Sequence, residues 1–274
     1  MTSPVYAIIV THDSADVLPL CINALAAQTC PPERIVVVDS GSRDKGYLDE
    51  LRHDMDLSVL QQENIGFSRA NNIGLKALPQ RSTGMVVFLN PDTFLETDAL
   101  AEATASLAEY HDVAVVGGRL SGYDATTQQA TYRIDSTGIF RKWYGRWYDR
   151  GHGEIERGQY EAASEVPAVC GALMCCRLEA LAGLADTGVF DERFFLYKED
   201  IELSLRLRKN GWKLLYQPRV RAFHCRGWQR QRSDVPYTAR LLAAKSEILL
   251  YLRHPSPYML WATGKYLLVR LFRC

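Results

Sequence analysis

Short runs of apolar residues alternate with amphipathic segments through the first half of the chain. The runs are continuous rather than alternating, which is typical of strands covered on both faces of a sheet. We expect strands at Val5–Val10, Arg34–Asp39, Leu57–Gln61, Met85–Leu89 and Val113–Val116. We expect helices at Asp16–Gln28, Tyr47–Asp54, Gly66–Ala77 and from the cap Thr97 to Tyr110. This order predicts an α/β fold, with a doubly wound, mostly parallel sheet and helices on both faces.

The pattern changes in the second half. Residues 121–166 are rich in Gly, Tyr, Trp and Arg, and they predict a loop-rich excursion rather than a separate domain. Regular structure is then expected at Ala168–Arg177, in a helix from near Asp200 to before Gly211, and in strands Lys213–Tyr216 and Val220–Phe223. Pro236–Leu252 and Tyr258–Phe272 predict a C-terminal helical extension.

Polar residues follow each of the first four expected strands. They are Thr11-His12, Asp39-Ser40-Gly41-Ser42, Glu63-Asn64-Ile65-Gly66-Phe67 and Asn90-Pro91-Asp92-Thr93. Ligands of such sheets bind beyond the carboxyl ends of the strands, so these residues are expected to share one site. Carboxylates at this edge of the sheet, such as Asp39 and Asp92, would repel a phosphate unless a divalent cation lies between the carboxylates and the phosphate. Each Asp alone could instead be a turn or a helix cap, but their joint placement favours a diphosphate site.

Two further features lie in the second half. Glu199 and Asp200 are adjacent carboxylates at the start of an expected helix. They either cap that helix and interact with its dipole, or one of them serves as a general base. His224 follows the last expected strand. A lone histidine is more often structural, but this one would complement Asp92 as a metal ligand if the fold brings them together.

The ordered set of these segments resembles the family 2 glycosyltransferases with a GT-A fold, particularly the bacterial rhamnosyltransferase-like members. The resemblance runs from about Val5 to Trp228. It is carried by Ile9–His12, Val36–Ser42, Asn64–Asn72, Phe88–Thr93, Asp149–Gly151, Gly171–Ala172, Phe190–Phe195 and Glu199–Leu203. The resemblance implies an inverting, metal-assisted glycosyltransferase. Its donor would be a dTDP- or UDP-sugar, with rhamnose the first sugar to test, and its acceptor a hydroxyl of a glycan or lipid-linked glycan in cell-surface polysaccharide synthesis.

The resemblance also implies roles for particular residues. Asp200, with Glu199 beside it, would deprotonate the acceptor hydroxyl. Asp92 and His224 would hold a Mg²⁺ or Mn²⁺ ion that bridges the diphosphate, while Gly171 and Ala172 would keep the acceptor approach open. Donor contacts would come from Thr11, His12, Asp39, Ser40, Asn64, Gly66, Phe67, Arg69, Ala70, Asn72, Asn90 and Asp92.

The sequence departs from the widest form of the family at the metal motif. That motif is usually Asp-x-Asp, and its first position here is Asn90, as in the rhamnosyltransferase-like branch. One carboxylate fewer should weaken metal binding, because hard cations favour charged oxygen ligands.

The resemblance implies a GT-A domain over residues 1–230, with a nucleotide-sugar half (1–118) and an acceptor and catalytic half (119–230). The aromatic and basic segment Arg141–Arg150, including Trp143 and Arg150, either walls the acceptor site or packs over the sheet edge. Residues 231–274 would form a helical segment rich in apolar, aromatic and basic residues. Three alternatives stay open for it: an interfacial helix at a membrane, a homodimer contact, or docking on its own domain.

Composition narrows the function classes. Lys and Arg total 32 against 32 Asp and Glu, so a nucleic-acid partner is not expected. No signal peptide or long apolar run is apparent and the seven cysteines suggest free thiols. We therefore expect a cytoplasmic protein, with the inner face of the membrane as an alternative. A non-catalytic nucleotide-sugar-binding protein and a nucleotidyltransferase compete with the transferase. The latter class usually has a Gly-rich, basic loop after the first strand, unlike Thr11–Asp16.

Overall fold

The computed structural model describes residues 3–51, 55–79, 82–184, 188–225 and 235–273. The strands of its central sheet are β1 (Val5–Thr11), β2 (Arg34–Ser40), β3 (Leu57–Gln62), β4 (Met85–Leu89), β5 (Thr93–Leu95), β6 (Val113–Asp124), β7 (Gln129–Ser136), β10 (Ser164–Glu165), β11 (Leu173–Arg177) and β12 (Lys213–His224). The sheet order is β10-β12-β6-β11-β4-β1-β2-β3, with β5 paired to β12 and β7 to β6. Strands β8 (Ile139–Arg141) and β9 (Trp147–Asp149) form a separate ribbon.

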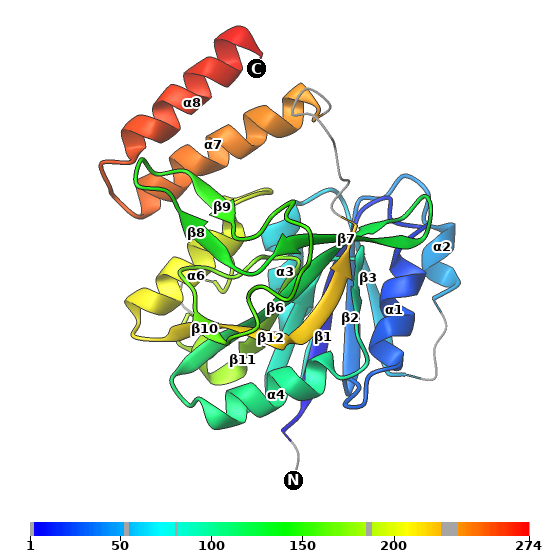
Figure 1. Ribbon diagram of the computed structural model, residues 1–274. Coiled ribbons are helices and arrows are strands. Elements are labelled where there is room, and N and C mark those ends of the chain that lie inside the picture. Colours follow the sequence, from blue (N-terminus) through cyan, green and yellow to red (C-terminus); the bar gives the residue numbers. More distant parts are fainter. Residues whose placement is uncertain (1–2, 52–54, 80–81, 185–187, 226–234, 274) are drawn as a thin grey trace.

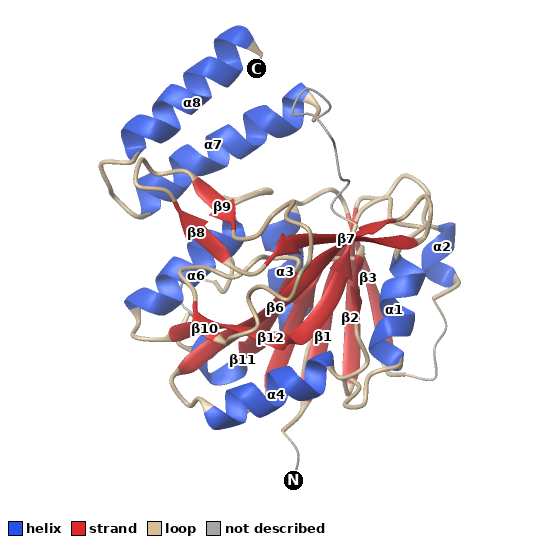
Figure 2. Cartoon of the chain, in the orientation of Figure 1, coloured by secondary structure: helices blue, strands red, loops and turns tan. Residues whose placement is uncertain are grey.

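The helices cover both faces of this sheet (Figures 1 and 2). They are α1 (Leu18–Ala26), α2 (Gly46–Asp49), α3 (Phe67–Lys76), α4 (Ala99–Glu109), α5 (Leu178–Ala182), α6 (Glu199–Lys209), α7 (Tyr237–Arg253) and α8 (Met259–Phe272). Helices α1 and α4 pack into one apolar core, while α3, α5 and α6 pack into the core on the opposite face. Both faces of the sheet are therefore buried, as the continuous apolar runs predict.

The parallel part of the sheet sets the position of the first site residues. Strands β2 and β4 flank β1, β3 flanks β2, and all these pairs are parallel. Every residue of β1 is buried, and Thr11 at its end is in register with Asp39 of β2. The parallel register brings the polar residues after these strands to one edge of the sheet. The predicted α/β class and mostly parallel sheet are confirmed.

The largest difference from the expected elements lies in residues 121–166. This segment contains the end of β6 and all of β7, β8, β9 and β10, rather than a loop-rich excursion. Strand β7 is largely exposed in its first five residues and buried in its last three, so it lacks the continuous apolar run of a central strand. Strand β11 is antiparallel to both of its neighbours, β4 and β6.

Three smaller expectations are also corrected. The two strands expected at Lys213–Tyr216 and Val220–Phe223 are one strand, β12, with a register shift between Gln217 and Arg221 that accommodates Pro218. Strand β5 is an unexpected addition. The helix expected at Tyr47–Asp54 is the short α2, and residues 52–54 lie outside the described part of the chain.

Helices α7 and α8 form a hairpin at the edge of the molecule, beside β8 and β9 (Figure 1). The expected domain boundary at residue 230 falls among residues 226–234, outside the described residues, as does Trp228. Among the helices that are described, none combines the length and the apolar character needed to cross a membrane.

Candidate active site

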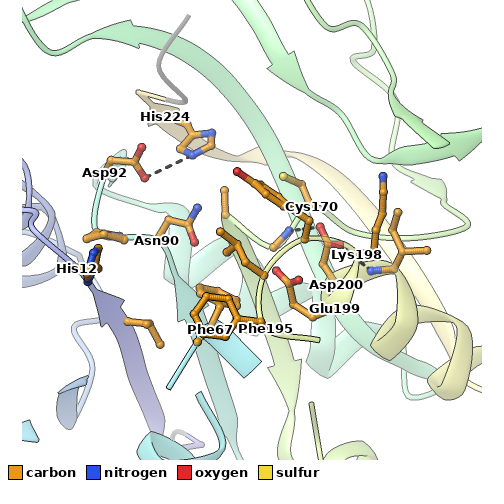
Figure 3. Close-up of a pocket in the computed structure, with 18 of the residues that line it drawn as sticks. His12, Phe67, Asn90, Asp92, Cys170, Phe195, Lys198, Glu199, Asp200 and His224 are labelled. Carbon is orange, nitrogen blue, oxygen red and sulfur yellow. Dashed lines mark hydrogen bonds and ion pairs between the residues drawn. The ribbon is translucent and has the colours of Figure 1, made fainter. Parts of the chain in front are cut away.

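A cavity of about 620 Å³ lies beyond the carboxyl ends of β1 and β4. Figure 3 shows residues that line it, with Asp92 and His224 on one side and Glu199 and Asp200 on the other. The residues expected to contact the donor that do line it are Thr11, His12, Ser40, Asn64, Gly66, Phe67, Asn90 and Asp92. Gly171 and Ala172, expected near the acceptor, line it as well.

The fold brings His224 to Asp92 through backbone pairing. Strand β12 pairs with β5 so that His224 lies opposite Thr93, and the next backbone N–H, of Cys225, donates to the Asp92 carbonyl at 3.0 Å. The His224 Nε2 atom then lies 3.4 Å from Asp92 Oδ1. Its Nδ1 atom lies 2.8 Å from Oδ2 of Asp135, a buried carboxylate on β7. This contact orients the imidazole so that Nε2 faces Asp92.

The Asp92 and His224 pair suits a divalent cation held jointly with a diphosphate. Mg²⁺ commonly binds one or two carboxylates and completes its coordination with substrate phosphates and water. No cluster of three or more His, Cys, Asp or Glu side chains in the described part of the chain could hold a metal ion. Burial lowers the pKa of His224, but the carboxylates of Asp135 and Asp92 outweigh this effect and raise that pKa to about 9. A cation would therefore compete with a proton for Nε2.

Asp200 is held rigidly at the start of α6. Its Oδ2 accepts the backbone N–H of Gly171 at 3.0 Å, and its Oδ1 accepts that of Ile201 at 2.8 Å. A Cβ atom at Gly171 would lie 3.2 Å from Asp200 Cβ, so a larger residue there would crowd the carboxylate. Burial raises the pKa of Asp200 above its usual range, whereas the two N–H donors favour its ionised form. A partly desolvated, oriented carboxylate of this kind suits a general base.

Glu199 differs from its neighbour in protonation. Burial and the adjacent Asp200 carboxylate raise the pKa of Glu199 to about 8, so this side chain is mostly neutral at pH 7. Its Oε2 atom is buried and has no hydrogen-bond partner among the described residues. The two preceding residues, Tyr197 and Lys198, both have left-handed backbone angles, with φ of 72° and 71°. Side chains with Cβ atoms rarely adopt such angles, and strain of this kind is typical of functional sites.

On the donor side, hydrogen bonds fix the residues at the ends of β1 and β2. Thr11 Oγ1 lies 3.0 Å from the Tyr47 hydroxyl, and His12 Nδ1 lies 2.9 Å from the Ser40 carbonyl. Asp39 is fully buried beneath them, where it accepts the backbone N–H and the hydroxyl of Ser42. Asp39 does not line the cavity, and the Lys45 ammonium lies 3.9 Å from its Oδ2.

Gly66 sits where two loops cross. Its φ is +81°, and a Cβ atom there would lie 2.6 Å from the Phe195 ring. The N–H of Phe67 also donates to the Phe195 carbonyl at 2.7 Å. Only glycine fits here, because the backbone at Gly66 lies against Phe195. This contact joins the loop after β3 to the loop before α6.

Other expected contacts lie outside the cavity. Arg69 and Asn72 line a second cavity, of about 730 Å³, where both contact Glu192, and Ala70 is fully buried in the core. The Asn72 amide exchanges two hydrogen bonds with the backbone of Phe190, so its role here is to join α3 to the loop before α6. These side chains face away from the cavity, since α3 presents them on its far side.

Two expected acceptor residues of the segment Arg141–Arg150, Trp143 and Arg150, also lie outside the cavity lining. Trp143 is 85% exposed and does not line the cavity. Arg150 donates to the carbonyl and hydroxyl of Thr137, and its guanidinium stacks on the rings of Phe140, Tyr160 and Tyr216. Of the two alternatives for Arg150, packing over the sheet edge therefore describes its surroundings.

Sequence reasoning reaches one part of this site only as the segment Arg141–Arg150. Within that segment, Trp147, Tyr148 and Asp149 of β9 line the cavity. Asp149 belongs to one of the segments that carry the family resemblance, which was the available signal. Asp135 had no such signal, because only the pairing of β7 with β6 brings it to His224.

The sheet topology, with a cavity beyond the strand ends that carries Asp92 and His224 on one side and adjacent carboxylates on the other, is that of a GT-A-type glycosyltransferase. Comparison with known proteins agrees with this class. The chain belongs to the glycosyltransferase-like family 2, whose family model matches residues 3–245.

Three curated relatives illustrate the likeness. The chain is 26% identical over 239 residues to the O-antigen biosynthesis protein RfbC of Myxococcus xanthus; the match covers 86% of this chain but only 18% of that protein. It is 21% identical over 250 residues to an N-acetylglucosaminyl-diphospho-decaprenol L-rhamnosyltransferase of Mycobacterium tuberculosis, covering 87% of this chain and 81% of the relative. It is 28% identical over 216 residues to the galactofuranosyltransferase GlfT1 of the same species, covering 77% and 66%.

Solved structures agree in fold. The mannosyltransferase PcManGT of Pyrobaculum calidifontis, determined with GDP-mannose and Mn²⁺, superposes with a TM-score of 0.62 at 18% identity, covering 98% of this chain and 70% of that one. The S. aureus protein TarS 1-349, determined with UDP, superposes with a TM-score of 0.57 at 19% identity, covering 98% and 73%.

Proposed function

We propose that this glycosyltransferase moves a sugar from a nucleoside diphosphate sugar to an acceptor hydroxyl in one inverting displacement, assisted by a divalent cation. The observation that carries the proposal is the arrangement of the cavity. Asp92 and His224 lie at one side, the carboxyl groups of Glu199 and Asp200 at the other, and all four residues line the same space. A diphosphate at the first pair would leave the donor carbon between the two groups.

Thr11, His12 and Ser40 would bind the base and ribose, beside the buried Asp39. The diphosphate would lie at Asp92 and His224. A Mg²⁺ or Mn²⁺ ion bound there would neutralise charge on the departing nucleoside diphosphate. His224 is kept in place for this by its contact with Asp135, whether or not a ligand is bound.

Asp200 would accept the proton of the acceptor hydroxyl as that oxygen attacks the anomeric carbon. The bond to the diphosphate oxygen breaks on the opposite face, so one displacement inverts the carbon. The N–H groups of Gly171 and Ile201 hold Asp200 in position for this step. Glu199, mostly neutral at pH 7, keeps a second negative charge away from the base. No second nucleophilic carboxylate is needed, in contrast to retaining hydrolysis.

Two relatives guide the choice of substrates. A rhamnosyltransferase and a galactofuranosyltransferase are among the proteins similar to this chain. We propose dTDP-rhamnose as the first donor to test, with UDP-sugars next, and a glycan or lipid-linked glycan of cell-surface polysaccharide synthesis as the acceptor. Trp147, Tyr148 and Asp149 supply an aromatic and polar wall for that acceptor.

We place this activity in the cytoplasm. Cys21, Cys30, Cys175, Cys176 and Cys225 are free thiols, and all of them except Cys30 are buried. Unpaired cysteines are usual in a reducing compartment.

The decisive experiment compares two substitutions one residue apart. Asp200→Asn should lower turnover by about 10²- to 10⁴-fold, because the base is lost, while donor affinity measured by calorimetry stays unchanged. Glu199→Gln is the matched control and should keep most of the activity, since Glu199 is already largely neutral. Turnover is measured as nucleoside diphosphate release across a donor panel, with and without Mn²⁺. Near-normal turnover by Asp200→Asn would remove the base assignment.

A further inference from the structure

The hairpin of α7 and α8 touches two walls of the central cavity. On α7, the Ser246 hydroxyl donates to the Leu196 carbonyl at 2.9 Å, and the Tyr251 hydroxyl donates to the Gly145 carbonyl at 2.6 Å. Leu196 lines the cavity, and Gly145 lies in the turn between β8 and β9, whose residues Trp147–Asp149 line it too. The hairpin therefore lies directly behind the acceptor side of the site.

Helix α8 packs on α7 through one face. Ala262 and Val269 are buried on that face. Trp261 Nε1 donates to Glu247 of α7 at 3.2 Å, and the Lys265 ammonium forms an ion pair with the same carboxylate. These contacts fix which side of α8 points away from the protein.

The opposite side of α8 is an apolar surface, which we call the outer stripe. It consists of Leu260, Leu267, Leu268, Leu271 and Phe272, which are 81%, 47%, 53%, 68% and 71% exposed. At 100° per residue these positions fall on one side of the helix. Single exposed apolar residues are normal on protein surfaces, but five on one helix of 14 residues form a patch that marks an interaction site. Helix α8 is also the outermost element of the molecule (Figure 1).

The charges around the outer stripe have one sign. Arg270 on α8, Arg273 just after α8 and Lys245 on α7 are all exposed. None of the three forms an ion pair with a carboxylate in the described part of the chain. Glu247 is the one carboxylate among the described residues 235–273, and it is buried and paired with Lys265. The surface is thus apolar with a basic border.

This combination selects among the three alternatives for the C-terminal segment. Docking on its own domain accounts for the inner face of α8 and leaves the outer stripe uncovered. A symmetric contact with a second copy would bring the basic borders of two chains together. A surface of anionic lipids matches both properties, since it accepts apolar side chains below the headgroups and attracts basic ones at the phosphates.

We propose that the outer stripe of α8 docks this protein on an anionic lipid surface. The leucines and Phe272 would enter the boundary between headgroups and acyl chains, with Arg270 and Arg273 at the lipid phosphates. The family model matches residues 3–245, so α8 lies beyond the matched range. Docking would hold the acceptor side of the cavity beside the bilayer, which suits a lipid-linked acceptor. That last point rests on the proposed function, whereas the docking does not.

The test is co-sedimentation of the full chain with vesicles of phosphatidylcholine alone and with added phosphatidylglycerol. We expect binding to the anionic vesicles that weakens by at least about 10-fold at high salt, because exposed charges are screened. The double substitution Leu267→Glu and Leu271→Glu should abolish it. Leu20→Glu, at an exposed leucine of α1, is the matched control and should bind like the unmodified chain.

The readouts separate the possible outcomes. Thermal unfolding and donor affinity should be unchanged in all three proteins, because the substituted side chains are exposed and none of them lines the cavity. Absence of binding to anionic vesicles, or equal binding by the double variant, would overturn the proposal. The proposal would also be overturned if the unmodified chain were a dimer in solution and the double substitution made it a monomer. The outer stripe would then be the contact with a second copy of the chain. Loss of donor turnover with vesicle binding intact would count only against the proposed function.

Discussion

The two halves of the domain build their polar sites in different ways. In residues 3–118, site residues such as Thr11 and Asn90 directly follow the strands that carry them, and the parallel register of those strands brings them together. In the second half, side chains hold one another across long stretches of chain. Asp135 of β7 orients His224 of β12, and the backbone of Gly171 anchors Asp200. The first site is thus a consequence of sheet topology, and the second depends on individual tertiary hydrogen bonds.

Removing the carboxylate of Asp92, which follows β4, should weaken ligand binding more than the substitution of Asp135 described below. Asp92→Ala should lower donor affinity in the presence of Mn²⁺ by about 100-fold. Loss of a group that only supports a metal ligand costs about 10- to 100-fold in metal affinity, and loss of the ligand itself should cost at least as much. Titration calorimetry with and without Mn²⁺ measures this. Asp98→Ala, at an exposed carboxylate before α4, is the control. Equal donor affinity for Asp92→Ala with Mn²⁺ would show that the strand-end carboxylate does not serve the donor.

A substitution of Asp135 tests whether long-range support matters in the second half. Asp135→Asn should weaken Mn²⁺-dependent donor binding by about 10- to 100-fold, because His224 loses the carboxylate that orients it. Affinity measured without metal should not change, which distinguishes positioning from general loss of structure. Asp124→Asn, at the turn between β6 and β7, is the matched control. If both variants bound donor and Mn²⁺ equally well, the contrast between the two halves would fail.

The smallest effect concerns the pH dependence of stability. The pKa of Glu199 is about 8 in the folded chain and about 4.5 when exposed, so the folded state keeps a proton that the unfolded state loses between these values. Stability should therefore fall as pH rises through this window. Glu199→Gln cannot lose that proton, so its melting temperature above pH 8 should exceed that of the unmodified chain by several degrees. Melting curves that stay parallel from pH 5 to 9 would contradict the assigned pKa.

The same contrast explains how far the sequence predicts the structure. The strands and helices of the first half follow from continuous apolar runs, since a strand buried on both faces leaves that pattern whatever its partners. Strand β7 leaves no such pattern, because its first five residues are exposed or half-buried. Residues 121–166 therefore predict a loop-rich excursion, although they contain the strand β9 whose residues Trp147–Asp149 line the cavity.

Individual residues show the same limit. Asn72 lies in a segment typical of the family, yet its side chain joins α3 to the Phe190 backbone and faces a second cavity. Position along a motif does not reveal which side of a helix a residue occupies when its partner lies more than a hundred residues away. From the sequence, His224 and Asp92 could form one site only if the fold brought their segments together. The pairing of β12 with β5 does this.

The pairing of β12 with β5 has a consequence for how such proteins diversify. His224 lies opposite Thr93, and the Cys225 N–H bonds the Asp92 carbonyl, so the backbone itself fixes the distance between these two side chains. Insertions or replacements in the segments between them, such as β8 and β9, need not disturb that distance. The Asp92 and His224 side of the cavity can therefore stay constant while the wall formed by Trp147–Asp149 changes.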